Sequence, residues 1–284
     1  MIFDTHAHYD DKAFDADRTQ MLASLAEAGI GRVVDVGSTI ESNAQVLALA
    51  NAWPQVYAAL GVHPSECGPL TDEILYHLEK QIAANRYASG TGDLAADASQ
   101  PGMATDVLQS ETNAGKVVAV GEIGLDYHEG DEDRALQKEA LRVQLELASE
   151  WDLPVNIHLR DAWGDLFTIL EDCRHLHLRG ILHCFSGSFE VYERARRCGD
   201  FSVGIGGVVT FKKASLAETV KRIPLEHIVL ETDAPYLAPV PNRGKRNESA
   251  YLPLVAAKVA ELKGLTFEEV EAATTQNAEK LYRI

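Results

Sequence analysis

Short apolar runs alternate with amphipathic stretches along almost the whole chain. Buried strands are predicted at 2–6, 33–36, 56–60, 117–121, 155–158, 181–183, 201–205 and 228–231. Apolar positions at helical spacing predict helices at 17–28, 41–52, 71–85, 133–151, 163–173, 189–197 and 248–262. Strands that alternate with helices predict a parallel sheet, and eight such units favour closure into an α/β fold of the (β/α)8 (TIM) barrel type.

An open, doubly wound sheet is the alternative to a barrel. Such a sheet usually has a glycine-rich phosphate loop after its first strand, whereas this chain has Thr5-His6-Ala7-His8 there. The segment 86–115, rich in Gly, Ser, Ala, Thr and Asp, interrupts the alternation. We expect one barrel over 1–284, with 86–115 as a flexible surface insertion between the third helix and the fourth strand.

Composition and charge narrow the functional classes. With 284 residues, 46% of them hydrophobic, the chain is not of the disordered type. Its net charge of −17 argues against non-specific wrapping of nucleic acid, so a polyanionic substrate would need a local positive source. The sequence predicts no signal peptide and no membrane segment. Four widely spaced cysteines without a CxxC pair are typical of reduced thiols, and we expect a cytoplasmic protein with no obligatory protein partner.

Ionisable residues recur at the predicted carboxyl ends of strands, where barrels carry their reactive groups. His6 and His8 are two residues apart, so both imidazoles project to the same side of an extended strand. The other strand ends carry Glu122, His158, His183 and, after the eighth strand, Asp233. A single histidine at such a place is more often structural, but this combination on one rim predicts a site for Mg, Mn or Zn.

Barrel closure sorts these side chains into two groups. Strand eight becomes the neighbour of strand one, which places Asp233 beside His6 and His8, while His158 and His183 lie across the rim. Glu122 can then reach both groups. Because one carboxylate can bridge two cations, this arrangement predicts a site for two divalent metal ions. We expect Asp233 to be both a ligand and the acceptor of a proton from water, with Glu122 as its catalytic partner.

Six motifs carry a family resemblance over nearly the whole chain. They are DTHAH at 4–8, GEIGLD at 121–126, IHLRDA at 157–162, LHCFSGS at 182–188, ETDAPYL at 231–237 and RGKRNE at 243–248. In this order they resemble the TatD family of metal-dependent deoxyribonucleases. The resemblance implies a metal-dependent hydrolase barrel with the same six residues as ligands, acting as an exonuclease on DNA and to some extent on RNA. The chain departs from the family at Tyr9, in the segment His63-Pro64-Ser65-Glu66 and in the insertion.

Further polar residues are candidates for supporting roles. Strand alternation places Asp4 on the face of His6, and Glu231 on that of Asp233, so both carboxylates are predicted to point into the barrel beneath the ligands. There they would orient ligand imidazoles or meet each other through a proton or a basic group, and the alternative is that one of them is solvated at the rim. Four residues are candidates for binding substrate or its phosphate: His63, Arg160, Arg243 and Arg246. Lys245 extends the basic run, which follows the eighth strand, where barrels often bind phosphate. The expected substrates are DNA ends or short oligonucleotides.

Two other functions remain open. The same scaffold could polarise a carbonyl and hydrolyse amides or esters. A related barrel type bridges its metals with a carbamylated lysine at the end of strand four. This chain has Glu122 there, which favours the nuclease over the amide or ester hydrolase. A metal-binding protein without catalysis is the alternative outside the enzymes. Cleavage of DNA only with added metal would favour the nuclease.

Overall fold

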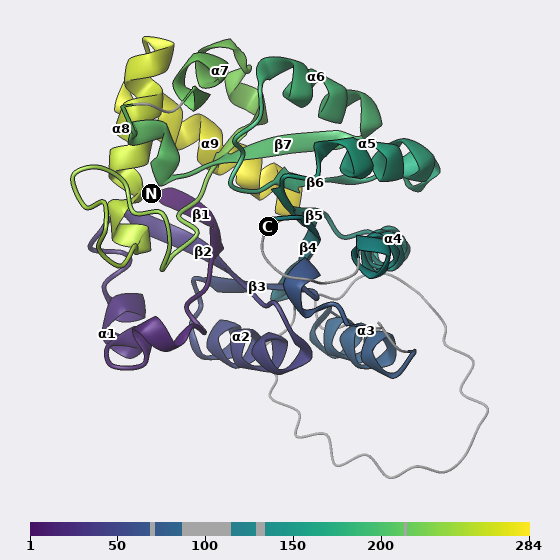
Figure 1. Ribbon diagram of the computed structural model, residues 1–284. Helices are drawn as coiled ribbons and strands as arrows, with labels where there is room; N and C mark the ends of the chain where they lie inside the picture. The colour runs from purple at the N-terminus through teal and green to yellow at the C-terminus, as the bar shows by residue number, and fades with distance from the viewer. Residues whose placement is uncertain (69–71, 87–114, 129–133, 213–214) are drawn as a thin grey trace.

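Eight parallel strands form one sheet in the order in which they occur along the chain, with helices around them (Figure 1). The computed structural model describes residues 1–68, 72–86, 115–128, 134–212 and 215–284. The strands are β1 (Ile2–Ala7), β2 (Ile30–Val36), β3 (Val56–Leu60), β4 (Val117–Asp126), β5 (Val155–Arg160), β6 (Arg179–Leu182), β7 (Asp200–Ile205) and β8 (Ile228–Leu230). The predicted (β/α)8 barrel is confirmed. Apart from its two end residues, the predicted insertion at 86–115 lies outside the described residues.

The helices follow the strands as expected, with several differences in their limits. They are α1 (Arg18–Ala23), α2 (Ile40–Ala52), α3 (Asp72–Arg86), α4 (Arg134–Glu150), α5 (Trp163–Asp172), α6 (Phe189–Cys198), α7 (Leu216–Arg222), α8 (Leu252–Lys263) and α9 (Phe267–Tyr282). The prediction for 17–28 was too long, because turns follow Ala23 and lead to Gly29 at φ 80°. The prediction for 248–262 began too early, since a 3-10 turn precedes Pro253 in the first turn of α8. Helices α7 and α9 were not predicted.

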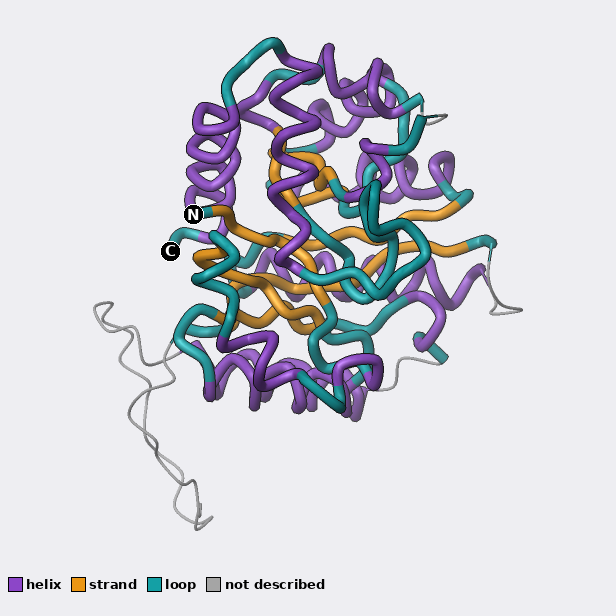
Figure 2. Tube along the Cα trace, turned by 90° about the vertical axis from the view of Figure 1, so that its left-hand side faces the viewer, coloured by secondary structure: helices purple, strands orange, loops and turns teal. Residues whose placement is uncertain are grey.

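Helix α9 closes the amino-terminal end of the barrel. Its Ala278, Leu281 and Tyr282 share one buried apolar cluster with side chains of the strands, among them Phe3. The Tyr282 hydroxyl donates to the carbonyl of Thr5. Figure 2 shows the strands enclosed between helices on both sides. The barrel therefore has a packed interior at this end and can present reactive groups only at the other.

The two edge strands meet at the carboxyl-terminal rim. Ala7 and Ala234 form a parallel bridge. The Asp233 N–H donates to the His6 carbonyl over 2.9 Å, and the His8 N–H donates to the Ala234 carbonyl over 2.8 Å. Closure thus brings the backbone of Asp233 beside His6 and His8, as predicted from the strand order.

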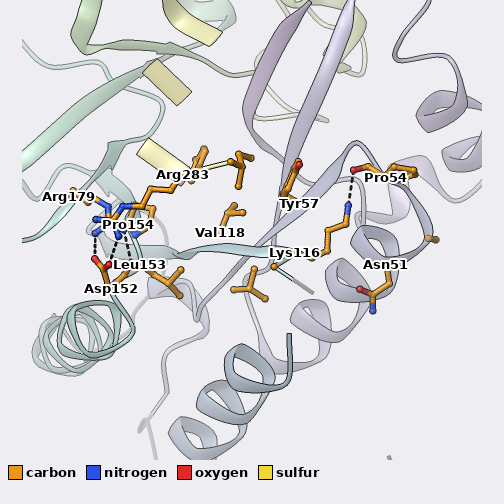
Figure 3. A pocket seen from close by; sticks show the side chains of 15 residues that line it. Asn51, Pro54, Tyr57, Lys116, Val118, Asp152, Leu153, Pro154, Arg179 and Arg283 are labelled. Atoms are coloured by element: carbon orange, nitrogen blue, oxygen red, sulfur yellow. Dashed lines mark hydrogen bonds and ion pairs between the residues drawn. The ribbon is translucent and has the colours of Figure 1, made fainter. Parts of the chain in front are cut away.

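A cavity of about 640 Å³ lies at the amino-terminal end of β4 and β5 (Figure 3). The charged side chains that line it have partners within the protein. Lys116 donates to three backbone carbonyls, among them that of Pro54, while Arg179 and Arg283 both bind Asp152. This end of a barrel usually serves stability, whereas the reactive groups of such barrels lie at the opposite rim.

Two further predictions can be compared with the described residues. Among them, no helix has both the length and the apolar character needed to cross a membrane. The four cysteines are free thiols, as expected.

Candidate metal centre

Side chains of six strands and the segments that follow them converge at the carboxyl-terminal rim. Their ligand atoms form three overlapping groups, within each of which all atoms lie within 4.8 Å of one another. The groups are His6–His8–Asp233, His6–Glu122–His183 and His63–Glu122–His158. The structure therefore brings together all six residues predicted as ligands, and it adds His63, which was predicted to contact substrate.

His6, His8 and Asp233 form the first half of the site. The two Nε2 atoms are 3.2 Å apart, and Asp233 Oδ1 lies 3.5 Å from His8 Nε2 and 4.0 Å from His6 Nε2. His8 Nδ1 donates to the carbonyl of Val36 over 2.8 Å, so Nε2 is the nitrogen that faces the group and can bind a cation once it loses its proton. Burial and the neighbouring imidazole of His183 hold the pKa of His6 well below its usual range. This imidazole is therefore neutral and able to bind a cation.

His158 and His183 form the second half together with Glu122. Glu122 Oε1 lies 2.8 Å from His158 Nδ1 and 2.9 Å from His183 Nε2. The two nitrogens are 3.3 Å apart. The His183 ring also stacks on that of His6 at 3.9 Å, which joins the two halves.

Glu122 faces both halves with different oxygen atoms. Its Oε1 faces His158 and His183, whereas its Oε2 lies 3.6 Å from His8 Nε2. Burial alone would raise the pKa of Glu122, but the surrounding imidazoles, above all that of His63, outweigh burial and hold it well below its usual range. An ionised carboxylate with one oxygen toward each set of nitrogens has the arrangement of a bridging ligand.

The local backbone explains how Glu122 reaches this position. The predicted strand over 117–121, with Glu122 at its end, was too short, since β4 continues to Asp126 and Glu122 lies within it. Strand β5 passes very close to β4 here. A Cβ atom on Gly124, which has φ 154°, would lie 1.8 Å from the carbonyl oxygen of His158. A glycine is needed at this position for the two ligand-bearing strands to pair.

Asp126 is a site residue that the sequence reasoning missed. Its Oδ2 lies 3.0 Å from His158 Nε2, while its Oδ1 accepts the His128 N–H over 2.8 Å. Burial alone would lower the pKa of His158, but the carboxylates of Asp126 and Glu122 raise it to about 9. Asp126 thus keeps a proton on His158 Nε2, so Nδ1 is the nitrogen that can exchange its proton for a cation. Strand alternation, which places 122, 124 and 126 on one face, was the available signal.

The two predicted second-shell carboxylates are both buried but differ in what they contact. Asp4 accepts from the hydroxyls of Thr232 and Ser249 over 2.7 and 2.6 Å and from the Thr232 N–H, and within the described part of the chain it makes no hydrogen bond to an imidazole. The pairing of β1 with β2 is irregular between Asp4 and Ala7, which upsets the simple alternation used to predict its direction. Asp4 therefore positions the backbone before Asp233, and the expectation that it orients an imidazole was wrong.

Glu231 does face an imidazole. Its Oε1 lies 3.7 Å from His183 Nδ1 and accepts the backbone N–H of Cys184. Burial raises the pKa of Glu231 to about 8, against the opposing effect of His183. A Cβ on Gly204 would lie 2.0 Å from Glu231 Oε2, so the missing side chain at Gly204 makes room for this carboxyl group.

His63 lies at the margin of the centre. Its Nδ1 accepts the backbone N–H of Ser65 over 3.1 Å, so the neutral ring carries its proton on Nε2, which is 3.7 Å from Glu122 Oε1. Burial lowers the pKa of His63 to about 4. His63 thus presents a neutral N–H donor to the site.

The predicted phosphate-binding arginines differ in their surroundings. Arg160 and Arg243 are exposed, and the Arg243 guanidinium lies over the ring of Phe211 at 4.6 Å. Arg246 instead donates twice to Asp17 at 2.7 Å and once to a backbone carbonyl. These contacts fix the loop before α8 to the segment before α1, so we leave Arg246 out of the proposal below.

The donors fit divalent cations. Neutral imidazoles and carboxylates suit Zn, Mn or Mg, and the buried atom His183 Nδ1, which has no hydrogen-bond partner, faces Glu231 as the N–H of a ligand histidine would. Four imidazoles and two carboxylates, with no lysine among the described ligand groups, also match the site predicted from strand ends.

Comparisons with known proteins agree with this arrangement. The family model described as TatD related DNase matches residues 3–283. The chain is 38% identical to the uncharacterized metal-dependent hydrolase YabD of Bacillus subtilis over 100% of both chains. It is 29% identical to the 3′-5′ ssDNA/RNA exonuclease TatD of Citrobacter rodentium, over 100% of this chain and 98% of that one. The crystal structure of the TatD homologue YjjV of Escherichia coli matches with a TM-score of 0.84 and 30% identity, over 100% of this chain and 98% of the other.

Proposed function

We propose that this chain, which belongs to the TatD related DNase family of metal-dependent hydrolases, removes nucleotides from the 3′ ends of single-stranded DNA and RNA with two divalent cations. The observation that carries the two-cation part is the position of Glu122, with one carboxylate oxygen toward each group of nitrogens. The substrate is suggested by the names of relatives such as the Citrobacter rodentium exonuclease. It is also suggested by the exposed arginines near the rim.

The proposal assigns the six residues to two cations. His6, His8 and Asp233 would hold one, His158 and His183 the other, and Glu122 both. When bound, such cations lower the pKa of water and neutralise the charge that develops on a phosphate.

The remaining chemistry belongs to side chains of the chain itself. Asp233 is partly exposed, with 15% of its side chain accessible, so its carboxylate can accept a proton from an attacking water. His63 offers its Nε2–H to a phosphate oxygen. Arg160 and Arg243 supply positive charge for the phosphate and for the nucleotide beyond it.

The test begins with protein stripped by EDTA. It is incubated with a 5′-labelled single-stranded DNA, an RNA of the same sequence and a chromogenic carboxylate ester, with and without Mg²⁺ or Mn²⁺. We expect stepwise shortening of the oligonucleotides only with metal. Glu122→Gln should abolish it, whereas Glu139→Gln, which changes an exposed glutamate of α4, should not.

Metal-dependent hydrolysis of the ester with intact oligonucleotides would contradict the proposal and favour the ester hydrolase. Shortening from the 5′ end would contradict the proposed polarity.

A further inference from the structure

Exposed apolar side chains are concentrated on the loop that follows Asp233. In the residues that the structure describes, seven large hydrophobic side chains are exposed, and three of them, Tyr236, Leu237 and Val240, lie within five positions. Their exposed fractions are 54%, 40% and 44%. A cluster of this kind beside a site indicates a contact surface for a ligand.

The backbone holds this loop in a defined conformation. The Tyr236 N–H donates to the Asp233 carbonyl over 2.7 Å, and the Val240 N–H donates to Thr210 Oγ1 over 2.9 Å. Leu237 has φ 54°, a left-handed conformation that is uncommon for leucine. Its carbonyl oxygen packs where Gly207 has no side chain, since a Cβ there would lie 2.1 Å away. The apolar side chains are therefore exposed by a fixed backbone.

The same loop adjoins the candidate metal centre. The Tyr236 ring lies 6.4 Å from the ring of His8, inclined at 66°, and its hydroxyl donates to Asp11 Oδ2 over 3.3 Å. Leu237 and Asp233 line one small cavity. A group that rests on Tyr236 and Leu237 is thus next to the proposed cations.

Positive charge accompanies the apolar cluster. Lys212, Arg243 and Lys245 are exposed on the segments that flank it, and Arg243 stacks on Phe211. In a chain of net charge −17, such a group of cations favours an anionic ligand locally. An exposed apolar surface beside a metal centre and near cations is complementary to a nucleotide, which combines an aromatic base with phosphates.

We propose that Tyr236 and Leu237 form a stacking platform for the base of the terminal nucleotide. Arg243, supported by Phe211, contacts a phosphate of the same strand. This inference rests on the proposed nuclease function and adds a subsite for the base. Because stacking on an aromatic ring accepts every base, the platform recognises a base without selecting its identity.

The test compares two single-stranded DNA substrates that differ only at the 3′ end, one with a normal terminal nucleotide and one with an abasic residue. Stacking of one base changes binding by about 5- to 150-fold. We expect the wild-type protein with Mn²⁺ to prefer the normal end by a factor in this range, mainly through KM. The ratio should fall to about one in Tyr236→Ala and persist in Tyr236→Phe, which keeps the ring.

Tyr76→Ala is the matched control, since Tyr76 is exposed to a similar extent, 52%, on α3, and it should keep the wild-type ratio. Cleavage of both substrates at equal rates by the wild-type protein, or an unchanged ratio in Tyr236→Ala, overturns the platform and leaves the nuclease function intact. Absence of cleavage of any oligonucleotide overturns both. A wild-type dimer that becomes a monomer in Tyr236→Ala, without a change in the ratio, would identify the surface as an interface between copies.

Discussion

Replacement of Asp126 by asparagine tests how the proposed second cation is held. The backbone N–H of His128 can only donate, and it lies 2.8 Å from Oδ1. In Asp126→Asn, the single amide oxygen would be taken by this donor, so the amide NH₂ group would face His158 Nε2. A donor there stabilises the tautomer that carries its proton on Nδ1. That atom, 2.8 Å from Glu122, is the one that must bind the cation.

The expected effect follows from the contact that is lost. Removal of a partner that orients a ligand histidine lowers metal affinity by about 10- to 100-fold. In free energy this is about 1.4 to 2.7 kcal/mol. Only the site that contains His158 should weaken, because Asp126 contacts His158, whereas His6, His8 and Asp233 form a separate group.

Titration calorimetry of EDTA-stripped protein with Mn²⁺ measures both sites. Asp172→Asn is a matched control, because it removes an exposed carboxylate that pairs with Arg142 on the outside of the barrel. Thermal unfolding of the stripped proteins checks that each variant is folded. Superimposable titration curves for the wild type and Asp126→Asn would refute the reasoning, as would equal weakening of both sites.

Three other predictions concern catalysis, stability and protons. Asp233→Asn should lower kcat on single-stranded DNA by about 100-fold or more with an unchanged circular dichroism spectrum, and near wild-type turnover with saturating metal would exclude Asp233 as proton acceptor. Arg246→Ala should lower the melting temperature by a few degrees, since the pair with Asp17 is lost, and should leave kcat/KM within twofold; a large loss of kcat/KM would return Arg246 to the substrate site. The carboxylates near His8 and His158 raise their pKa values to about 10 and about 9, so both imidazoles are protonated at pH 7 without metal. Metal binding should then release about two protons and tighten as pH rises toward 9, and calorimetry in buffers of different ionisation enthalpy would contradict this if no protons were released.

The positions of the proposed ligands could be predicted because they depend on strand order. His6, His8 and Asp233 come together where β1 and β8 close the barrel, and closure follows from the eightfold alternation of strands and helices. To predict these ligands, it was enough to place each side chain at or near the carboxyl end of a strand. The individual contacts between the side chains did not have to be known.

The contacts behind the ligands could not be predicted in the same way. The irregular start of β1 gives Asp4 the hydroxyls of Thr232 and Ser249 as partners, and strict alternation does not foresee this. Asp126 was not predicted as a site residue because the fourth strand was expected over 117–121, whereas β4 extends to Asp126. A shift of one residue in the pairing of two strands changes which side chains come into contact. Such shifts arise from the pairing itself, so the pattern within one strand does not predict them.

Helix α9 illustrates a different difficulty. Its sequence, FEEVEAATTQNAEKLY, has few large apolar residues, and two of the positions that it buries at helical spacing are Thr274 and Ala278. The helix is recognisable at its start, where Thr266 and Glu269 form a capping box. Its buried face uses small side chains such as Ala278, which fit the end of the barrel. Packing against a curved surface, more than hydrophobicity, makes this segment a helix.

The net charge of −17 determines how a nuclease of this design would meet its substrate. At ionic strengths near 0.1 M, charges interact over about 10 Å, so the acidic outer helices repel a polyanion that lies along them. Cations held by His6, His8 and their partners, together with Arg160 and Arg243, would reverse the sign only at the rim. A strand end needs to bring only a few phosphates within that distance, whereas a long duplex must place many outside it. The same charge that opposes binding along DNA therefore favours binding of an end.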